Sequence, residues 1–196
     1  IVIDLNGKNF KTTGTIVNNG TATIKNGTIT RVTDYGDEQY CVENRGNLTL
    51  SDLTVVADSD NSPDAALIFN GNANETTSAL TINGGTYSTY GKYTVQNESG
   101  NTVINGGEFK CNYSSSTDKG AVIFNNALLT VNDGKFFAET KNSYVIYSKN
   151  GSVSTVLNGG EYTGSGLYFN SSNTIEIKCG TFINFQPKYS YMAAGF

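Results

Sequence analysis

The chain has 196 residues, of which 22 are Gly and 2 are Pro, and it contains no His and no Trp. Its net charge of −4, without a basic stripe, argues against a nucleic-acid surface, and no run of about 18 apolar residues could insert into a membrane. Without His, the Ser-His-Asp and Cys-His catalytic arrangements and His-ligated metal sites are excluded. Few charges, many β-branched residues and frequent Gly predict an all-β protein with many tight turns.

One short unit recurs along the chain: an apolar residue, two or three residues of Asn, Asp or Gly, a variable residue, and an aromatic or β-branched residue. After an imperfect copy at 4–10, it appears as IKNGTI (24–29), LSDLTV (50–55), INGGTY (82–87), INGGEF (104–109), VNDGKF (131–136), LNGGEY (157–162) and IKCGTF (177–182). Asn and Gly favour tight turns, so each copy is expected to join two short strands.

A second unit lies between the copies of the first: IVNN (16–19), CVEN (41–44), LIFN (67–70), TVQN (94–97), VIFN (122–125), VIYS (145–148) and LYFN (167–170). The strict alternation predicts three short strands in every repeat of roughly 20–30 residues, which a three-faced β-solenoid requires. We therefore expect a right-handed parallel β-helix of about seven coils over residues 1–182. A propeller would need more residues per blade, and a β-sandwich, which stays open, would not explain turns that recur in register.

Stacking of the coils places equivalent residues above one another and predicts continuous rows of side chains. One apolar row is Ile29, Val55, Tyr87, Phe109, Phe136, Tyr162 and Phe182, and a second is Val17, Val42, Ile68, Val95, Ile123, Ile146 and Tyr168. A structural asparagine ladder is expected at Asn19, Asn44, Asn70, Asn97, Asn125 and Asn170, with Ser148 as its exception, and a shorter ladder at Asn83, Asn105, Asn132 and Asn158. Stacked amides can donate to one neighbouring coil and accept from the other.

The two ends of the chain lead to different expectations. Residues 183–196, with Phe185, Tyr189, Tyr191 and Phe196, are expected to cap the C-terminal end. No equivalent cap is visible at Ile1, so the N-terminal end is expected to continue or to dock onto other subunits or flanking domains.

The copies LTINGGTY, TVINGGEF and TVLNGGEY resemble the pectate-lyase-like right-handed β-helix repeats of large bacterial surface proteins and of phage virion proteins. The ending CGTFINFQPKYSYMAAGF is similar to the close of many such arrays. The resemblance covers nearly the whole chain and implies the architecture. It is weak for activity, because many functions occur on this fold.

The resembled superfamily also includes polysaccharide lyases and glycoside hydrolases, which form the alternative function. A hydrolase needs two facing carboxylates, and such a lyase needs a calcium cluster with a basic residue. The acidic residues are scattered, and the weak metal candidate is Asp58, Asp60 and Asp64, for which solvated loop tips are the plainer explanation. No catalytic residue and no cofactor are predicted, and the three Cys residues are expected to be small core or turn residues.

Binding has the better case because Phe69, Phe124, Tyr147 and Phe169 occupy one repeat position. If this position faces outward it forms an aromatic stripe for a protein partner, a surface glycan or an oligomer contact, and if it faces inward it belongs to the core. We therefore expect a non-enzymatic structural and interaction module, extracellular, from a bacterial cell surface (an adhesin segment) or a phage virion (a decoration, fibre or spike protein).

Overall fold

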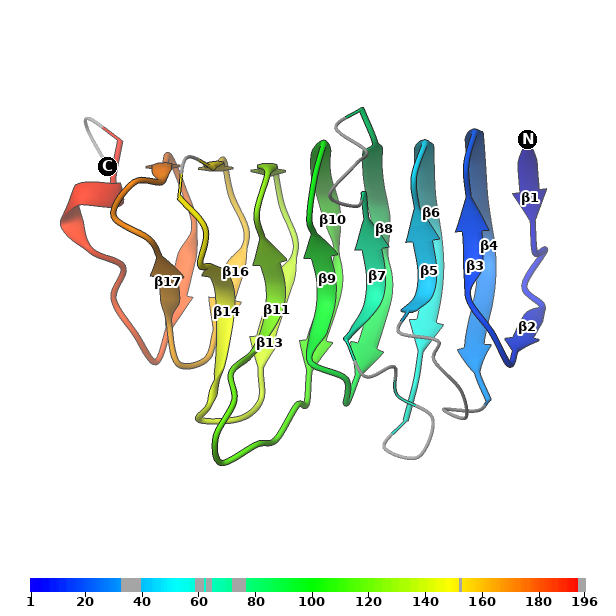
Figure 1. Ribbon diagram of the computed structural model, residues 1–196, viewed down its shortest axis with the longest axis horizontal. Helices are drawn as coiled ribbons and strands as arrows, with labels where there is room; N and C mark the ends of the chain where they lie inside the picture. Colours follow the sequence, from blue (N-terminus) through cyan, green and yellow to red (C-terminus); the bar gives the residue numbers. More distant parts are fainter. Residues whose placement is uncertain (33–39, 59–61, 63–64, 72–76, 152, 194–196) are drawn as a thin grey trace.

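The computed structural model describes residues 1–32, 40–58, 62, 65–71, 77–151 and 153–193. In these residues the chain forms two sheets of 12 and 7 strands, in which every strand pairing is parallel, and one short 3-10 helix, η1 (Tyr189–Tyr191). The strands stack side by side along the long axis, with the two termini at opposite ends (Figure 1). The chain is thus all-β with parallel sheets, in agreement with the class of fold predicted from its sequence.

The 12-stranded sheet contains both halves of each Asn-Gly unit. In its middle the two halves form one long strand: β4 (Thr21–Arg31), β6 (Asn47–Val56), β8 (Ala79–Thr89) and β10 (Asn101–Cys111). Towards the ends they separate into β1 (Val2–Asp4) and β2 (Asn9–Thr12), β12 (Leu128–Val131) and β13 (Lys135–Ala138), β15 (Ser154–Leu157) and β16 (Glu161–Thr163), and β18 (Thr174–Ile177) and β19 (Thr181–Ile183). The turns inside the long strands appear as irregularities of register.

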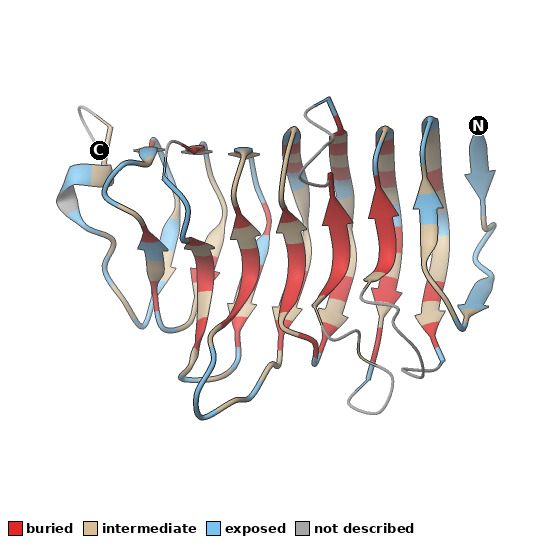
Figure 2. Ribbon diagram, viewed as in Figure 1, coloured by how far each residue is buried: buried red, intermediate tan, exposed pale blue. Residues whose placement is uncertain are grey.

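The 7-stranded sheet contains the second unit of each repeat. Its strands are β3 (Ile16–Asn18), β5 (Tyr40–Asn44), β7 (Ala66–Asn70), β9 (Tyr93–Asn97), β11 (Gly120–Asn125), β14 (Ser143–Ser148) and β17 (Leu167–Phe169). They pair in chain order, so each repeat lies directly on the one before it. Burial is concentrated in the middle strands of this sheet and declines towards both ends (Figure 2).

Residues with positive φ form the turns of the Asn-Gly units and allow neighbouring strands to approach closely. Asn26 and Asp52 adopt positive φ of 57° and 49°, in the left-handed region that these side chains tolerate. In the next repeat Gly85 has φ of 99°, and a Cβ built on it would lie 2.2 Å from the Leu53 carbonyl oxygen. The turn at this position therefore requires Gly both for its conformation and for the approach of the neighbouring strand.

The first apolar row lies in the core, as predicted. The strand registers align Ile29, Val55, Tyr87, Phe109, Phe136, Tyr162 and Phe182 in consecutive strands. The five rings stack with centroids 4.8–5.1 Å apart and planes within 8–12° of parallel. We call these five rings the inner stack.

The second apolar row differs from the prediction at its two ends. The register places Ile16, not Val17, beside Val42, and Leu167, not Tyr168, beside Ile146. Val17 and Tyr168 are each 44% exposed. The error is a shift of one residue, which in a β-strand moves a side chain to the opposite face.

The asparagine ladder is continuous in the middle of the molecule and also shifts at its ends. Nδ2 of Asn44 donates to Oδ1 of Asn70 at 2.8 Å, Asn70 to Asn97 at 3.0 Å, and Asn97 to Asn125 at 2.7 Å. The first member is Asn18, at 2.8 Å from Asn44, and not Asn19 as predicted. Asn170 donates instead to the Lys149 carbonyl, while the Ser148 position pairs with Phe169.

The shorter ladder matches its expected residues. Nδ2 of Asn105 donates to Asn83, Asn132 to Asn105, and Asn158 to Asn132, at 2.7–2.8 Å. These four amides are exposed, whereas Asn44, Asn70, Asn97 and Asn125 are completely buried.

The C-terminal segment folds back over the last repeat. Met192 forms a parallel bridge with Ile177, the Tyr191 ring packs edge-on against Phe169 at 5.4 Å, and Phe185 packs edge-on against Phe182. These contacts lie within residues 169–192, at the C-terminal end of the two sheets; Phe196 is outside the described residues.

Candidate binding surface

The outer side of the 7-stranded sheet presents aromatic side chains in two rows. Val42, Ile68, Val95 and Ile123 belong to the main core, while Ala66, Tyr93 and Ala121, each two residues earlier in its strand, form a separate cluster on the outer side. Seven rings gather there: Tyr40, Phe69, Tyr93, Phe124, Tyr144, Tyr147 and Tyr168. We call this set the aromatic face.

An alternation of Tyr and Ala builds the first two ring pairs. Tyr40 is in register with Ala66, and its ring stacks at 4.2 Å on Phe69, which belongs to the same strand as Ala66. Tyr93 is likewise in register with Ala121 and stacks at 4.6 Å on Phe124. The small Ala leaves room for the Tyr of the preceding strand to cross over it. The pairs therefore recur every second strand.

The C-terminal part of the aromatic face is more open. Tyr144, Tyr147 and Tyr168 lie with centroids 5.1–5.6 Å apart, and the Tyr168 plane is tilted by 42° and 59° to its two neighbours. Tyr168 is 44% exposed, whereas Phe69 and Tyr93 are 5% and 8% exposed. Desolvation raises the pKa of Tyr147, as it does for Tyr40 and Tyr93, which fits their packing against other rings.

Of the four residues predicted as a stripe, three lie in one outward row. Phe69 and Phe124 flank Gln96 in register, and Tyr147 follows Phe124. Phe169 is not in this row: it is 7% exposed and packs on Tyr191, and Tyr168 takes the predicted place. Tyr40 and Tyr144 were not among the predicted residues. The segments YCVEN, YTVQN and YVIYS each begin with Tyr in alternate strands, and this recurrence could have indicated them.

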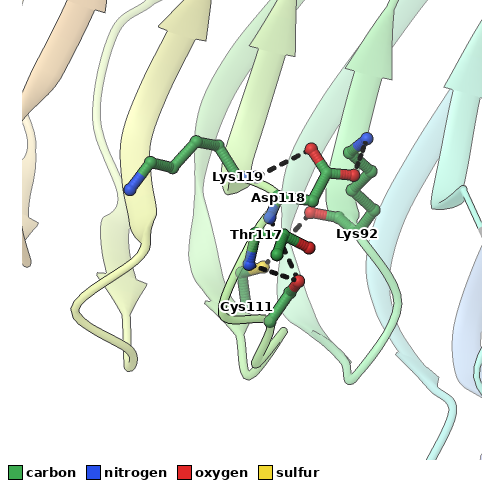
Figure 3. A network of polar contacts seen from close by, with 6 residues as sticks. Lys92, Cys111, Thr117, Asp118 and Lys119 are labelled. Atoms are coloured by element: carbon green, nitrogen blue, oxygen red, sulfur yellow. Dashed lines mark hydrogen bonds and ion pairs between the residues drawn. The ribbon is translucent and has the colours of Figure 1, made fainter.

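A network of polar contacts holds the 112–119 loop beside this face (Figure 3). Nζ of Lys92 lies 2.5 Å from Oδ2 of Asp118 and 5.6 Å from the centre of the Tyr93 ring. The Asp118 carboxylate also accepts the Lys119 backbone N–H, and the hydrogen bond from Lys92 is the largest cause that lowers its pKa. The Cys111 thiol lies 3.6 Å from the Lys92 carbonyl oxygen.

The opposite edge of the face contains a smaller polar cluster of Gln96, Glu98 and Asn126. Nε2 of Gln96 donates to Glu98 at 3.1 Å, and Nδ2 of Asn126 donates to both carboxylate oxygens at 3.1 and 3.2 Å. Gln96, whose amide donates to Glu98, lies between Phe69 and Phe124 in the outward row, so the cluster adjoins the row of rings.

The predicted metal candidate gains no support from the geometry. Asp58 is exposed, and Asp60 and Asp64 lie outside the described residues. In the part of the chain that the structure describes, no three His, Cys, Asp or Glu side chains come together as ligands. Cys41 and Cys111 are buried, which raises the pKa of their thiols to about 12 and about 11, and Cys179 is exposed.

No protein-family model, curated protein sequence or solved structure matches this chain. Among the described residues, no helix has the length and apolar character needed to cross a membrane.

Proposed function

We propose that this chain is a single-stranded right-handed parallel β-helix of about seven coils, capped by residues 183–196, that serves as a rigid, non-enzymatic module for attachment or assembly. The stacked parallel strands, the recurring turns and the resemblance to pectate-lyase-like repeats support this architecture. The setting we propose is extracellular, on a bacterial cell surface or a phage virion. Recovery from purified virions would favour the second, and recovery from a secreted or wall fraction the first.

The observation that supports an interaction role is the aromatic face. Exposed groups of aromatic side chains on a soluble protein mark interaction sites, because rings left in water are stabilised when a partner covers them. Rings of the aromatic face pack in a cluster separate from the main core, and Tyr168 at the C-terminal end of the face is 44% exposed. The face lies on stacked strands, which would hold its rings in a fixed arrangement.

A further contact is proposed at the N-terminal end. Ile1, Val2 and Phe10 are 87%, 67% and 49% exposed there, and a flanking domain or subunit would cover them.

Replacing Tyr147 and Tyr168 together by Ala tests the proposal. We expect the wild-type chain to self-associate or to bind in a panel of surface glycans and proteins, and the double variant to lose that association without unfolding. Sedimentation and surface plasmon resonance would measure the association. Leu128→Ala, which removes an outward side chain of 55% exposure from the other sheet, is the matched control and should bind normally. Equal binding by wild type and double variant would refute the role of the face.

The alternative function, a polysaccharide lyase or glycoside hydrolase, has no specific geometric observation in its favour. Incubation with acidic polysaccharides, followed by assay for unsaturated or reducing ends, would separate it from the binding role. New ends produced by the purified chain would overturn the non-enzymatic proposal.

A further inference from the structure

The polar cluster of Gln96, Glu98 and Asn126 holds a carboxylate at the edge of the aromatic face. Three amide N–H···O contacts of 3.1–3.2 Å fix Glu98, two of them from the same Asn126 nitrogen. Within the described part of the chain, Glu98 has no ion-pair partner, because Arg45 pairs with Glu43 at 2.6 Å and Lys92 pairs with Asp118. The charge of Glu98 is therefore held in place by neutral groups alone.

The amide groups that hold Glu98 keep two of their own oxygens unpaired. Oε1 of Gln96 and Oδ1 of Asn126 are buried and have no hydrogen-bond partner. A buried acceptor without a donor is unfavourable, and exchanging oxygen and nitrogen in either amide would point an oxygen at the carboxylate. The two amides are thus oriented so that both donate to Glu98, while their own oxygens make no hydrogen bond.

The charged acceptor of the cluster is the Glu98 carboxylate. The amide N–H groups of Gln96 and Asn126 point at the carboxylate, and the backbone N–H groups of Glu98 and Asn126 donate to the carbonyls of Asn70 and Asn97. A sugar hydroxyl is neutral, so it would offer no compensating charge to Glu98 and would leave the carboxylate without a counter-charge. A guanidinium group has donors only, in a fork that matches a carboxylate.

The neighbouring rings favour the same chemistry. Gln96 separates Phe69 from Phe124 in the outward row, and each of these rings carries a stacked Tyr. Planar guanidinium groups pack well on aromatic rings, which an ammonium group does less effectively. Burial is the main cause that raises the pKa of Tyr40 and Tyr93, and the charge of Glu98 adds a smaller contribution to both.

From this geometry we infer that Glu98 and the rings beside it form a recognition site for an arginine side chain of a protein partner. The inference rests on the proposed function of the aromatic face and names the partner's chemistry. Glu98 receives the guanidinium N–H groups, Gln96 and Asn126 position the carboxylate, and the rings cover the arginine stem.

A titration with small probes tests the site without knowledge of the partner. The side-chain NH2 signals of Gln96 and Asn126 are followed in ¹⁵N-labelled protein while N-acetyl-arginine amide is added. We expect saturable shifts of both signals, weaker binding of N-acetyl-lysine amide, and no binding of the neutral isostere N-acetyl-citrulline amide. Methyl glycosides of neutral hexoses are titrated in parallel to represent a glycan ligand.

The matched variants are Glu98→Gln and Glu176→Gln. Glu98→Gln keeps the shape and removes the charge, and should weaken the arginine probe about tenfold. Glu176→Gln alters a carboxylate of the other sheet that pairs with Lys178, and should change nothing. Shifts caused by the glycosides, equal binding of citrulline and arginine, or unchanged binding by Glu98→Gln would overturn the inference. If association is lost in the Tyr147 and Tyr168 double variant while Glu98→Gln retains it, the aromatic face stands and the arginine site fails.

Discussion

The inner stack and the aromatic face come from the same repeat, yet their rings are arranged differently. The inner rings lie within 8–12° of parallel and repeat in every strand from Tyr87 to Phe182. The outer rings deviate by 20–59° and form pairs that recur every second strand. Inside, neighbouring strands and the opposite sheet surround the rings, so a single close-packed arrangement of the rings is favoured. Outside, the packing is less uniform, since Tyr168 is 44% exposed whereas Phe69 is 5% exposed beneath Tyr40.

The largest contrast should appear between two adjacent Phe residues of β13. Phe136 is buried in the inner stack, and Phe137 faces outward with Nζ of Lys110 5.5 Å from its ring centre. Phe136→Ala should lower the free energy of unfolding by about 3–5 kcal/mol, because it leaves a cavity between two stacked rings. Phe137→Ala should cost less than about 1 kcal/mol. Urea denaturation measures both, and similar losses would contradict the assignment of inside and outside.

The two asparagine ladders extend the contrast to polar groups. Asn97→Ala removes a buried amide that accepts from Asn70 and donates to Asn125, and should cost about 1–3 kcal/mol. Asn132→Ala removes the same chemistry from the exposed ladder, where water replaces the lost partners, and should cost less than about 0.5 kcal/mol. Thermal denaturation of the two variants gives the difference. Equal shifts of Tm would show that burial does not set the strength of these ladders.

The smallest effect concerns the hydroxyl group of Tyr162. Burial raises the pKa of this tyrosine, and its hydroxyl donates to the Gly159 carbonyl at 2.7 Å. Above the ordinary value near 10, the unfolded chain releases a proton that the folded chain retains, so stability falls as the pH rises, by at most about 1.4 kcal/mol per pH unit. Tyr162→Phe should lower stability at neutral pH by about 1 kcal/mol and make the alkaline decline shallower.

Denaturation at several pH values above 9 would measure that slope. Tyr87→Phe, in the same stack and with a pKa raised by the same cause, should reduce the slope again. An unchanged slope in the double variant would show that other groups dominate alkaline unfolding.

The sequence predicted the rows of the middle repeats, and its errors fall on the first and last strands of the 7-stranded sheet. β3 and β17 have three residues each, whereas β5 to β14 have five or six. A three-residue strand contains a single alternation, so the pattern cannot distinguish two registers that differ by one residue. Asn19, Val17, Tyr168 and Phe169 were all misplaced for this reason.

The sequence could not decide whether the predicted stripe faces inward or outward. Phe69 is 5% exposed although it lies on the outer side, because Tyr40 covers it. Hydrophobicity alone therefore makes it look like a core residue. The alternation of Tyr40, Ala66, Tyr93, Ala121 and Tyr144 holds the missing information, since a large and a small residue in turn indicate rings that cross between strands.

The two asparagine ladders donate their hydrogen bonds in opposite senses along the molecule. In the buried ladder each Nδ2 points to the following repeat, from Asn18 to Asn125, and in the exposed ladder each points to the preceding one, from Asn158 to Asn83. Aligned amides polarise one another, so each ladder adds a dipole along its length. Because the two run against each other, their axial dipoles oppose, and a rod lengthened by further repeats would not accumulate the field of either ladder at its ends.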